Sequence, residues 1–116
     1  MVGAFLGARE GRWAGCGPVT EKFDSVATFA ISQEGDDVTI REVGPRHQCN
    51  YRARYTQNGR MGSLLGSAVC DDQITRFFTA SEIQVGIESL SMRMRMSQVG
   101  TDCAFTGYGG GIRQLP

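Results

Sequence analysis

Several residue types are scarce in this chain of 116 residues, and each scarcity excludes a class of function. A single histidine, His47, rules out a metal site built from several histidines. No apolar run approaches the roughly 18 residues that a membrane-spanning helix needs. Lys+Arg and Asp+Glu are equal at 12 each, so the formal net charge is zero. General long-range attraction to nucleic acid or anionic membranes is therefore not expected, although a local patch of one sign is compatible with this balance.

The short motifs of catalytic and cofactor sites are also missing. The four cysteines never stand at the Cys-x-x-Cys interval of zinc or redox sites. The glycine run near the C-terminus lacks the Lys-Ser/Thr pair of a phosphate loop, and carboxylates gather in turns at 34–37 and 71–72. His47 follows Gly44-Pro45-Arg46 in a predicted turn, no nucleophile is directed at it, and we expect an ordinary surface histidine. We therefore expect no enzyme, cofactor or metal, since catalysis would have to be built on His47.

Glycine and β-branched residues are abundant instead. There are 16 glycines, and eight valines with six isoleucines outnumber five leucines, which favours pleated structure over helix. Apolar and polar residues alternate with a period of two in segments separated by turn residues. We expect an all-β fold of eight strands, at residues 11–17, 25–33, 38–41, 49–55, 61–70, 74–85, 90–96 and 103–107. Residues 1–10 are expected to form an N-terminal arm, and residues 11–116 a single β-barrel domain.

The segment 90–96 is the clearest two-faced strand. Its apolar positions are even-numbered and its polar positions odd-numbered: Leu90, Met92, Met94 and Met96 against Ser91, Arg93 and Arg95. Upstream the apolar positions are odd-numbered, at Ile83, Val85 and Ile87. This change of phase predicts a turn or bulge near residues 88–89.

Cysteines 16, 49, 70 and 103 allow three disulfide pairings. A hairpin loop centred between Gly59 and Arg60 places residues whose numbers sum to 119 opposite each other, and Cys49 with Cys70 satisfies this sum. Cys16 and Cys103 then fall near the first and last strands, which are neighbours if the sheet closes on itself. Disulfides indicate an oxidising compartment, periplasmic or extracellular, and four buried thiols in a cytosolic protein are the alternative. Residues 1–8 do not form an intact signal peptide, so the N-terminus does not decide between them.

Eight short strands joined by hairpin steps favour an antiparallel up-and-down barrel over a sandwich, because a sandwich needs longer crossing connections. An eight-stranded barrel either fills its interior with side chains or keeps room for one small ligand. Glycines within the predicted strands contribute no side chains to fill the interior of the barrel, which favours open space there.

The motif Gly11-Arg12-Trp13, a Gly-x-Trp early in the first predicted strand, and the eight-strand meander resemble the calycin-like group of small barrels. This group includes lipocalins, avidins and bacterial protease-inhibitor barrels. The resemblance implies that Trp13 closes one end of the barrel and that Arg113, from the last strand, packs across its ring through a cation–π contact. A tryptophan that only fills the core is the alternative. With one tryptophan the chain departs from avidin-like biotin sites, and it is shorter than typical lipocalins.

Five arginines stand at alternating strand positions, namely Arg41, Arg52, Arg54, Arg93 and Arg95. If this face points outward it is a solvated surface. If it points inward it lines the interior with cations and selects an anionic ligand. The methionines of 90–96 then take the opposite side, either as core or as an apolar pocket.

These patterns lead to a hypothesis of function. We expect a non-enzymatic barrel that binds a small apolar or amphipathic ligand in its mouth. The candidate ligand-binding residues are Trp13, Tyr51, Tyr55, Met92, Met94 and Arg113. The alternative is an inhibitor or interaction protein that blocks a partner enzyme through the N-terminal arm or the loops. No nucleic-acid partner and no membrane span are expected, and the sequence leaves a homodimer open.

Overall fold

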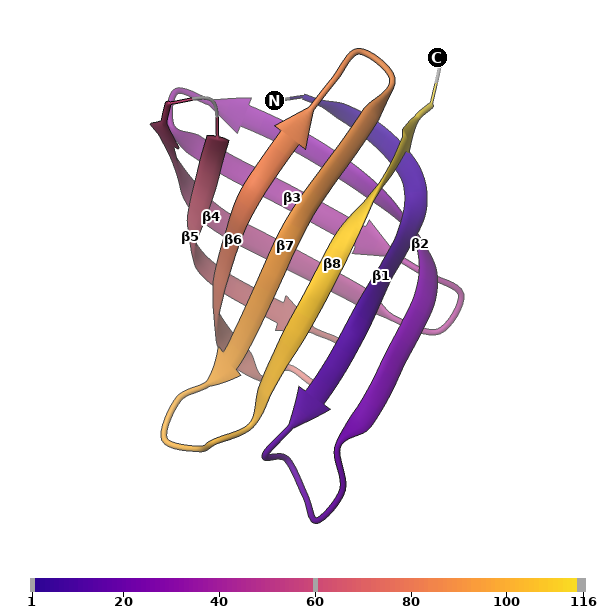
Figure 1. Ribbon diagram of the computed structural model, residues 1–116, viewed down its shortest axis with the longest axis vertical. Coiled ribbons are helices and arrows are strands. Elements are labelled where there is room, and N and C mark those ends of the chain that lie inside the picture. The colour runs from indigo at the N-terminus through magenta and orange to yellow at the C-terminus, as the bar shows by residue number, and fades with distance from the viewer. Residues whose placement is uncertain (1, 60, 115–116) are drawn as a thin grey trace.

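The computed structural model describes residues 2–59 and 61–114, and its eight strands close into a barrel (Figure 1). Each strand pairs antiparallel with the next one along the chain, and β1 pairs antiparallel with β8. The strands are β1 (Gly3–Ala14), β2 (Glu21–Glu34), β3 (Asp37–Val43), β4 (Gln48–Asn58), β5 (Met61–Cys70), β6 (Thr75–Val85), β7 (Ser89–Gln98) and β8 (Ala104–Arg113). The predicted all-β up-and-down barrel is confirmed.

The first strand is longer than the sequence predicted. Residues 3–10, expected to form an arm, belong to β1 and pair with β2 on one side. From Phe5 onward they also pair with β8 on the other side. The expectation of an arm over these residues is wrong because alternation is masked here: Ala4, Leu6 and Ala8 on the outer face are as apolar as the inward Phe5. The barrel therefore begins at Gly3.

The two ends of the barrel differ. One end carries the loops after β1, β3, β5 and β7, and we call it the plugged end. The other carries the turns after β2, β4 and β6 together with both chain termini, and we call it the open end. Figure 1 shows the termini and the projecting β6–β7 loop together at this end. Such alternation follows directly from eight strands that each reverse direction.

Both predicted disulfides are present, Cys49–Cys70 and Cys16–Cys103. In the β4–β5 register Cys49 lies opposite Cys70, and the same sum of 119 holds down to Asn58 opposite Met61. Arg60, on which the predicted loop centre depended, lies outside the described residues. Both bridges lie at the plugged end, where Cys16–Cys103 joins the β1–β2 loop to the residue before β8.

Side chains fill the middle of the barrel. A contiguous buried cluster includes Met92, Met94, Met96, Tyr51 and Phe78, so the methionine face is core. Open space was expected from the inward glycines, yet neighbouring side chains occupy the space beside them. A Cβ at Gly62 would overlap the ring of Tyr55, and one at Gly109 would overlap the sulfur of Met94. Any ligand site must therefore lie at an end or on the outside.

The change of phase before β7 has two parts. The chain reverses between Val85 and Ser89, as the predicted turn near 88–89 requires. Within β6, however, the register against β7 shifts between Ser81 and Gln84, and Glu82 has a φ of 52°. This bulge moves the buried positions from Ala80 to Ile83 and turns Ile83 toward the open end.

Candidate functional site

A buried carboxylate is the centre of the polar network inside the barrel. Glu42 follows the inward positions Val38 and Ile40 on β3, and its side chain is 0% exposed. Arg9 Nε donates to both carboxylate oxygens, at 2.9 and 3.0 Å. The hydroxyl of Tyr51 and Nε2 of His47 also donate to this carboxylate. We call Arg9, Glu42, His47 and Tyr51 the Glu42 hub, in which an ionised carboxylate is balanced by one buried guanidinium.

Aromatic rings hold the guanidinium of Arg9 in place. Its central carbon lies 4.2 Å from the ring centre of Phe23 and 4.7 Å from that of Phe105. Nη2 approaches the sulfur of Cys49 at 3.8 Å, whereas Nη1 has no partner among residues 2–59 and 61–114. The planar cation is thus fixed by stacking on two rings and by its ion pair with Glu42.

Tyr51 serves the hub as a neutral donor. Burial raises the pKa of its phenol well above the ordinary value of 10.0, and the charge of Glu42 and the hydrogen bond to it act in the same direction. The cation of Arg9 opposes this shift in pKa. The ring also packs on Phe78, with centres 4.7 Å apart. Both the hydroxyl and the ring of Tyr51 therefore make contacts inside the core.

His47 is not the surface histidine that the sequence predicted. Its side chain is 14% exposed, donates to Glu42 and meets the ring of Phe23 edge-on. Nε2 donates to Glu42, and the other ring nitrogen, Nδ1, lies 3.4 Å from Ser25 Oγ. The expectation that no nucleophile is directed at His47 is thus wrong. The contact between Nδ1 and Ser25 Oγ joins the β3–β4 loop to β2, and the Ser25 Oγ also lies 3.0 Å from the carbonyl oxygen of Val26.

The plugged end is closed by a different arginine from the one expected. Trp13 packs on Phe105 with ring centres 5.4 Å apart, and the guanidinium of Arg76 lies 4.9 Å from the Trp13 ring centre. Arg76 also bonds Asp72 at 2.8 Å, and this hydrogen bond lowers the pKa of the Asp72 carboxyl. Trp13 is partly buried and packs against the core at this end, and the Gly-x-Trp motif lies at the end of β1 rather than early in it.

Arg113 lies at the open end, so its predicted contact with Trp13 is wrong. Antiparallel pairing sets Arg113 opposite Phe5 and Trp13 opposite Phe105, which separates the two residues by most of β1. The Arg113 guanidinium lies 4.7 Å from the Phe5 ring centre and donates to the carbonyls of Val2 and Ile87. It thereby fastens the β6–β7 loop to the N-terminal strand.

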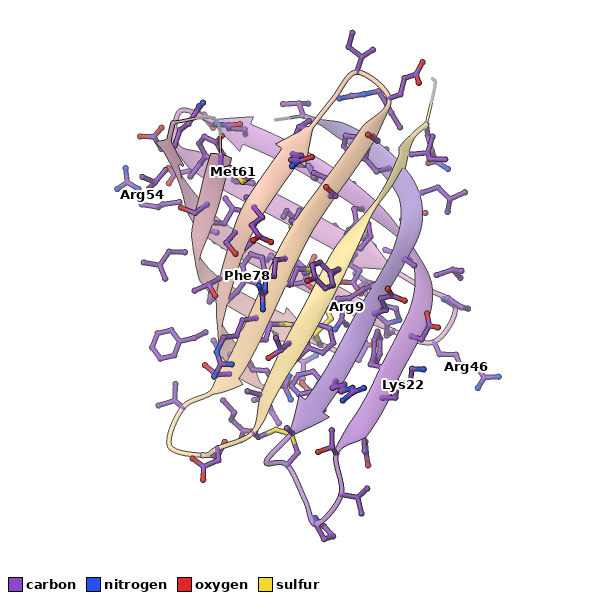
Figure 2. All side chains as sticks on the ribbon, viewed as in Figure 1. Arg9, Lys22, Arg46, Arg54, Met61 and Phe78 are labelled. Carbon is purple, nitrogen blue, oxygen red and sulfur yellow. A yellow bond between two sulfur atoms is a disulfide. The ribbon has the colours of Figure 1, made fainter. Side chains whose placement is uncertain are left out.

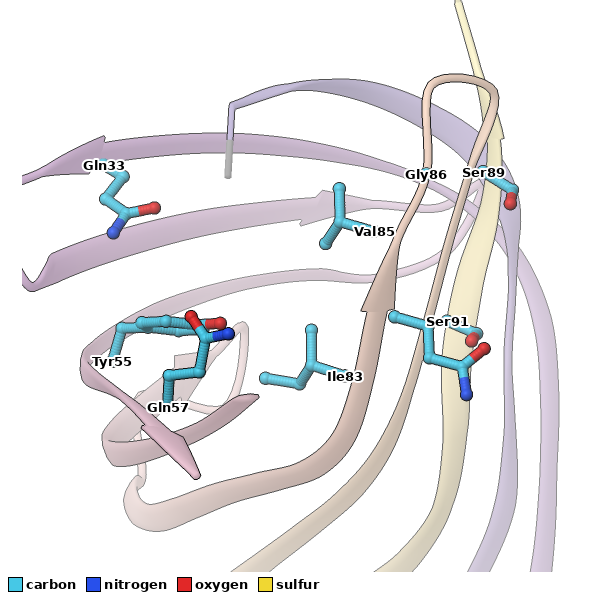
Figure 3. A pocket seen from close by; sticks show the side chains of 9 residues that line it. Gln33, Tyr55, Gln57, Ile83, Val85, Gly86, Ser89 and Ser91 are labelled. Carbon is cyan, nitrogen blue, oxygen red and sulfur yellow. The ribbon is translucent and has the colours of Figure 1, made fainter. Parts of the chain in front are cut away.

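A depression of about 810 Å³ occupies the open end (Figure 3). We call it the mouth. Its lining residues are Gln33, Tyr55, Gln57, Ile83, Gln84, Val85, Gly86, Ser89 and Ser91. Figure 3 shows Ile83 and Val85 facing Tyr55 and Gln33 across the opening. Among residues 2–59 and 61–114, the lining combines apolar and aromatic groups with neutral amides and hydroxyls and includes no charged side chain.

The structure does not bring the six predicted ligand residues together. Tyr55 lines the mouth, whereas Tyr51, Met92 and Met94 are buried in the core. Trp13 and Arg113 lie at opposite ends of β1 and β8. That Tyr55 contacts a ligand stays a prediction.

The five arginines at alternating positions point outward and are exposed, so a cation-lined interior is wrong. Figure 2 shows Arg54 extending away from the barrel, whereas Arg9 and Phe78 lie within its outline. The buried cations Arg9 and Arg76 were not singled out from the sequence. Arg76 and Glu42 each had a signal, a charged residue in phase with inward apolar neighbours on its strand, whereas Arg9 had none.

Comparison with protein-family models, curated proteins and solved structures finds no match to this chain. No helix long and apolar enough to cross a membrane is present in residues 2–59 and 61–114. Over the same residues, no three His, Cys, Asp or Glu side chains form a group that could hold a metal ion.

Proposed function

We propose that this protein is a binding barrel that holds a small amphipathic ligand in its mouth at the open end. One observation carries the proposal: a depression of about 810 Å³ lies above a filled core, with an apolar wall and neutral polar groups around it. This volume falls within the range of small-molecule sites. The architecture is consistent with the calycin-like barrels that the sequence resembles.

The chemistry of the lining selects the ligand class. Polar groups form the larger part of the lining, and Ile83, Val85 and the ring of Tyr55 add apolar surface whose burial would contribute to the affinity. The glutamine amides and serine hydroxyls that line the rest of the mouth can donate and accept hydrogen bonds without charge. We therefore expect an uncharged polar head group joined to a short apolar part. Because the core is filled, the ligand stays in the mouth and does not enter the barrel.

The proposal includes binding without catalysis, in an oxidising extracytoplasmic compartment. His47 and Glu42 hold each other and the β3–β4 loop, and they lie far along the barrel from the mouth. Two disulfides support an oxidising environment, and we propose the periplasm or the exterior of the cell.

Octyl glucoside, an uncharged amphiphile kept below its micelle concentration, tests the mouth, with octyl sulfate as its anionic counterpart. We expect backbone amide NMR signals of the mouth residues to shift with the glucoside and less with the sulfate. Val85→Ser should weaken binding by up to about tenfold, because one valine contributes roughly 1.5 kcal/mol when buried. Val99→Ser, an exposed valine at the plugged end, is the matched control. Absence of shifts at the mouth, or equal weakening by both variants, would contradict the proposal.

An interaction protein is the second candidate, and one observation favours it. Ile87, in the β6–β7 loop beside the mouth, is 89% exposed. The N-terminal arm proposed for this role is strand β1, so only the loops are left to carry it. Ile87→Ser separates the two functions, because it leaves octyl glucoside binding unchanged if the loop serves a protein partner and weakens binding if the loop covers the ligand.

A further inference from the structure

The outer face of β4–β7 carries mostly positive charge, although the whole chain is neutral. Arg52 and Arg54 on β4 and Arg93 and Arg95 on β7 point outward and are exposed. These four strands contain one carboxylate, Glu82 at the β6 bulge. The other strand carboxylates belong to β1–β3. The 12 basic and 12 acidic residues are therefore equal in number but unevenly distributed over the barrel.

Two large apolar side chains lie between the two arginine pairs. The pairing register places Arg54, Leu65, Thr79 and Arg95 in one row across β4, β5, β6 and β7. The adjacent row is Arg52, Ser67, Phe77 and Ser97. Leu65 is 67% exposed and Phe77 is 60% exposed. β4 and β7 lie on either side of β5 and β6 in the closed barrel wall, so cations flank the apolar ridge on both sides while the wall curves away from it.

These cations are poorly neutralised within the chain. Arg54 approaches Asp36 at 3.9 Å, but both side chains are largely exposed, so this pair contributes little. Arg95 donates to the hydroxyl of Thr106 at 3.4 Å. Within residues 2–59 and 61–114, Arg52 and Arg93 form no ion pair. The face therefore offers guanidinium groups to an external anion.

We propose that the outer face of β4–β7 docks on an anionic lipid bilayer, independently of ligand binding in the mouth. Leu65 and Phe77 enter the interface between head groups and acyl chains, and the flanking arginines bind lipid phosphates. Each basic residue near an anionic surface contributes to attraction, and the apolar pair supplies the contact that survives at higher salt.

The shape of the face favours a bilayer over a nucleic acid. Single-stranded nucleic acids bind in grooves where several aromatic rings stack on successive bases. Here the surface is the convex wall of a barrel, and Phe77 is the one aromatic side chain on the outward positions of β4–β7. The apolar ridge on β5 and β6 can instead face a bilayer directly, and the long arginine side chains of β4 and β7 can reach back along the curved wall to its anionic surface.

Co-sedimentation with vesicles tests the proposal. We expect the oxidised protein to bind vesicles of equal parts phosphatidylcholine and phosphatidylglycerol at low salt, and not vesicles of phosphatidylcholine alone. Arg52→Ser with Arg54→Ser should lower the partition coefficient roughly 10- to 30-fold. Arg12→Ser with Lys22→Ser removes the same charge from exposed positions on β1 and β2, and should change it less than about threefold.

The apolar ridge is tested separately. Phe77→Ser should weaken binding about tenfold, whereas Val26→Ser, an exposed apolar position on β2, should leave it unchanged. The proposal is overturned if the anionic vesicles are not bound, if the control pair weakens binding as much as the β4 pair, or if Phe77→Ser has no effect. It is also overturned if a single-stranded oligothymidine binds more tightly than the vesicles and depends on Arg52 and Arg54. Unchanged circular dichroism of each exposed variant shows that the fold persists.

Discussion

Replacing Glu42 with glutamine perturbs the Glu42 hub with almost no change in volume. In the wild-type protein the carboxylate receives Arg9 Nε on both oxygens and hydrogen bonds from Tyr51 and His47. Glutamine has a neutral amide, so its NH₂ group must face donors that previously met an anion. The Arg9 cation is then left inside the barrel without a counter-charge.

The expected cost is large because the side chain of Glu42 is fully buried and the Arg9 cation is buried with it. Removing one partner of a buried ion pair costs about 3–5 kcal/mol. A domain of this size has a total stability of about 5–15 kcal/mol, so the loss is a large fraction of it. With a urea dependence of about 1.5 kcal/mol per M, the unfolding midpoint should fall by roughly 2 to 3 M. Equilibrium unfolding in urea at pH 7, with disulfides intact, measures this.

Two further variants make the result interpretable. Glu34→Gln changes an exposed carboxylate and should alter the free energy of unfolding by less than about 0.5 kcal/mol. Arg9→Met with Glu42→Leu removes both charges together and should recover part of the stability, because an apolar pair incurs no desolvation of ions whereas Tyr51 and His47 lose their acceptor. A loss below about 1 kcal/mol for Glu42→Gln, or a double variant as unstable as the sum of its single changes, would refute a coupled buried pair.

Three further predictions follow from the same interior. The free energy of unfolding should fall as pH rises above about 10, because the unfolded chain releases the Tyr51 proton that the folded state holds at its raised pKa. Tyr51→Phe should flatten this dependence of stability on pH, which urea unfolding between pH 8 and 11 measures. Replacing Cys16 and Cys103 with serine opens a loop closed over a sequence separation of 87 and should lower the free energy of unfolding by about 4–5 kcal/mol. Calorimetry or urea unfolding measures this loss, and a smaller loss would argue against loop entropy as the cause of the stabilisation. A Cβ at Gly66 would overlap the β4 backbone, so Gly66→Ala should lower stability by about 1–3 kcal/mol in thermal melts, whereas Gly17→Ala, with open space around it, should be neutral.

The predictable part of the fold came from local patterns. In β7, strict alternation of methionine with arginine predicted a two-faced strand, and the structure shows that the methionine face is core and the arginine face is exposed. In β4 and β5, a tight turn set the register, so the pairing of Cys49 with Cys70 could be read from residue numbers. Both inferences need only period two and hairpin geometry, which neighbouring residues determine.

The candidate sites were less predictable. Arg9 lay in a segment without clean alternation, and His47 lay after a Gly-Pro turn that is typical of exposed loops. Neither residue has a local signal that connects it with Glu42, 33 positions after Arg9. The mouth was equally hidden, because Gln33, Tyr55 and Val85 reach it from three different strands. Sites of this kind depend on which strands become neighbours.

By itself, the order of residues determined the strand class, the turns and the two-faced pattern of β7, since each depends on residues close together in the chain. Hairpin geometry also favoured the pairing of Cys49 with Cys70. Tertiary structure alone decided that Arg76 rather than Arg113 covers Trp13, that a carboxylate and a guanidinium share the interior, and that the arginines of β4 and β7 flank Leu65 and Phe77. These depend on barrel closure and on the relative stagger of strands far apart in the chain. A one-residue change in that stagger would turn each side chain to the opposite face, so no local window of sequence contains the information.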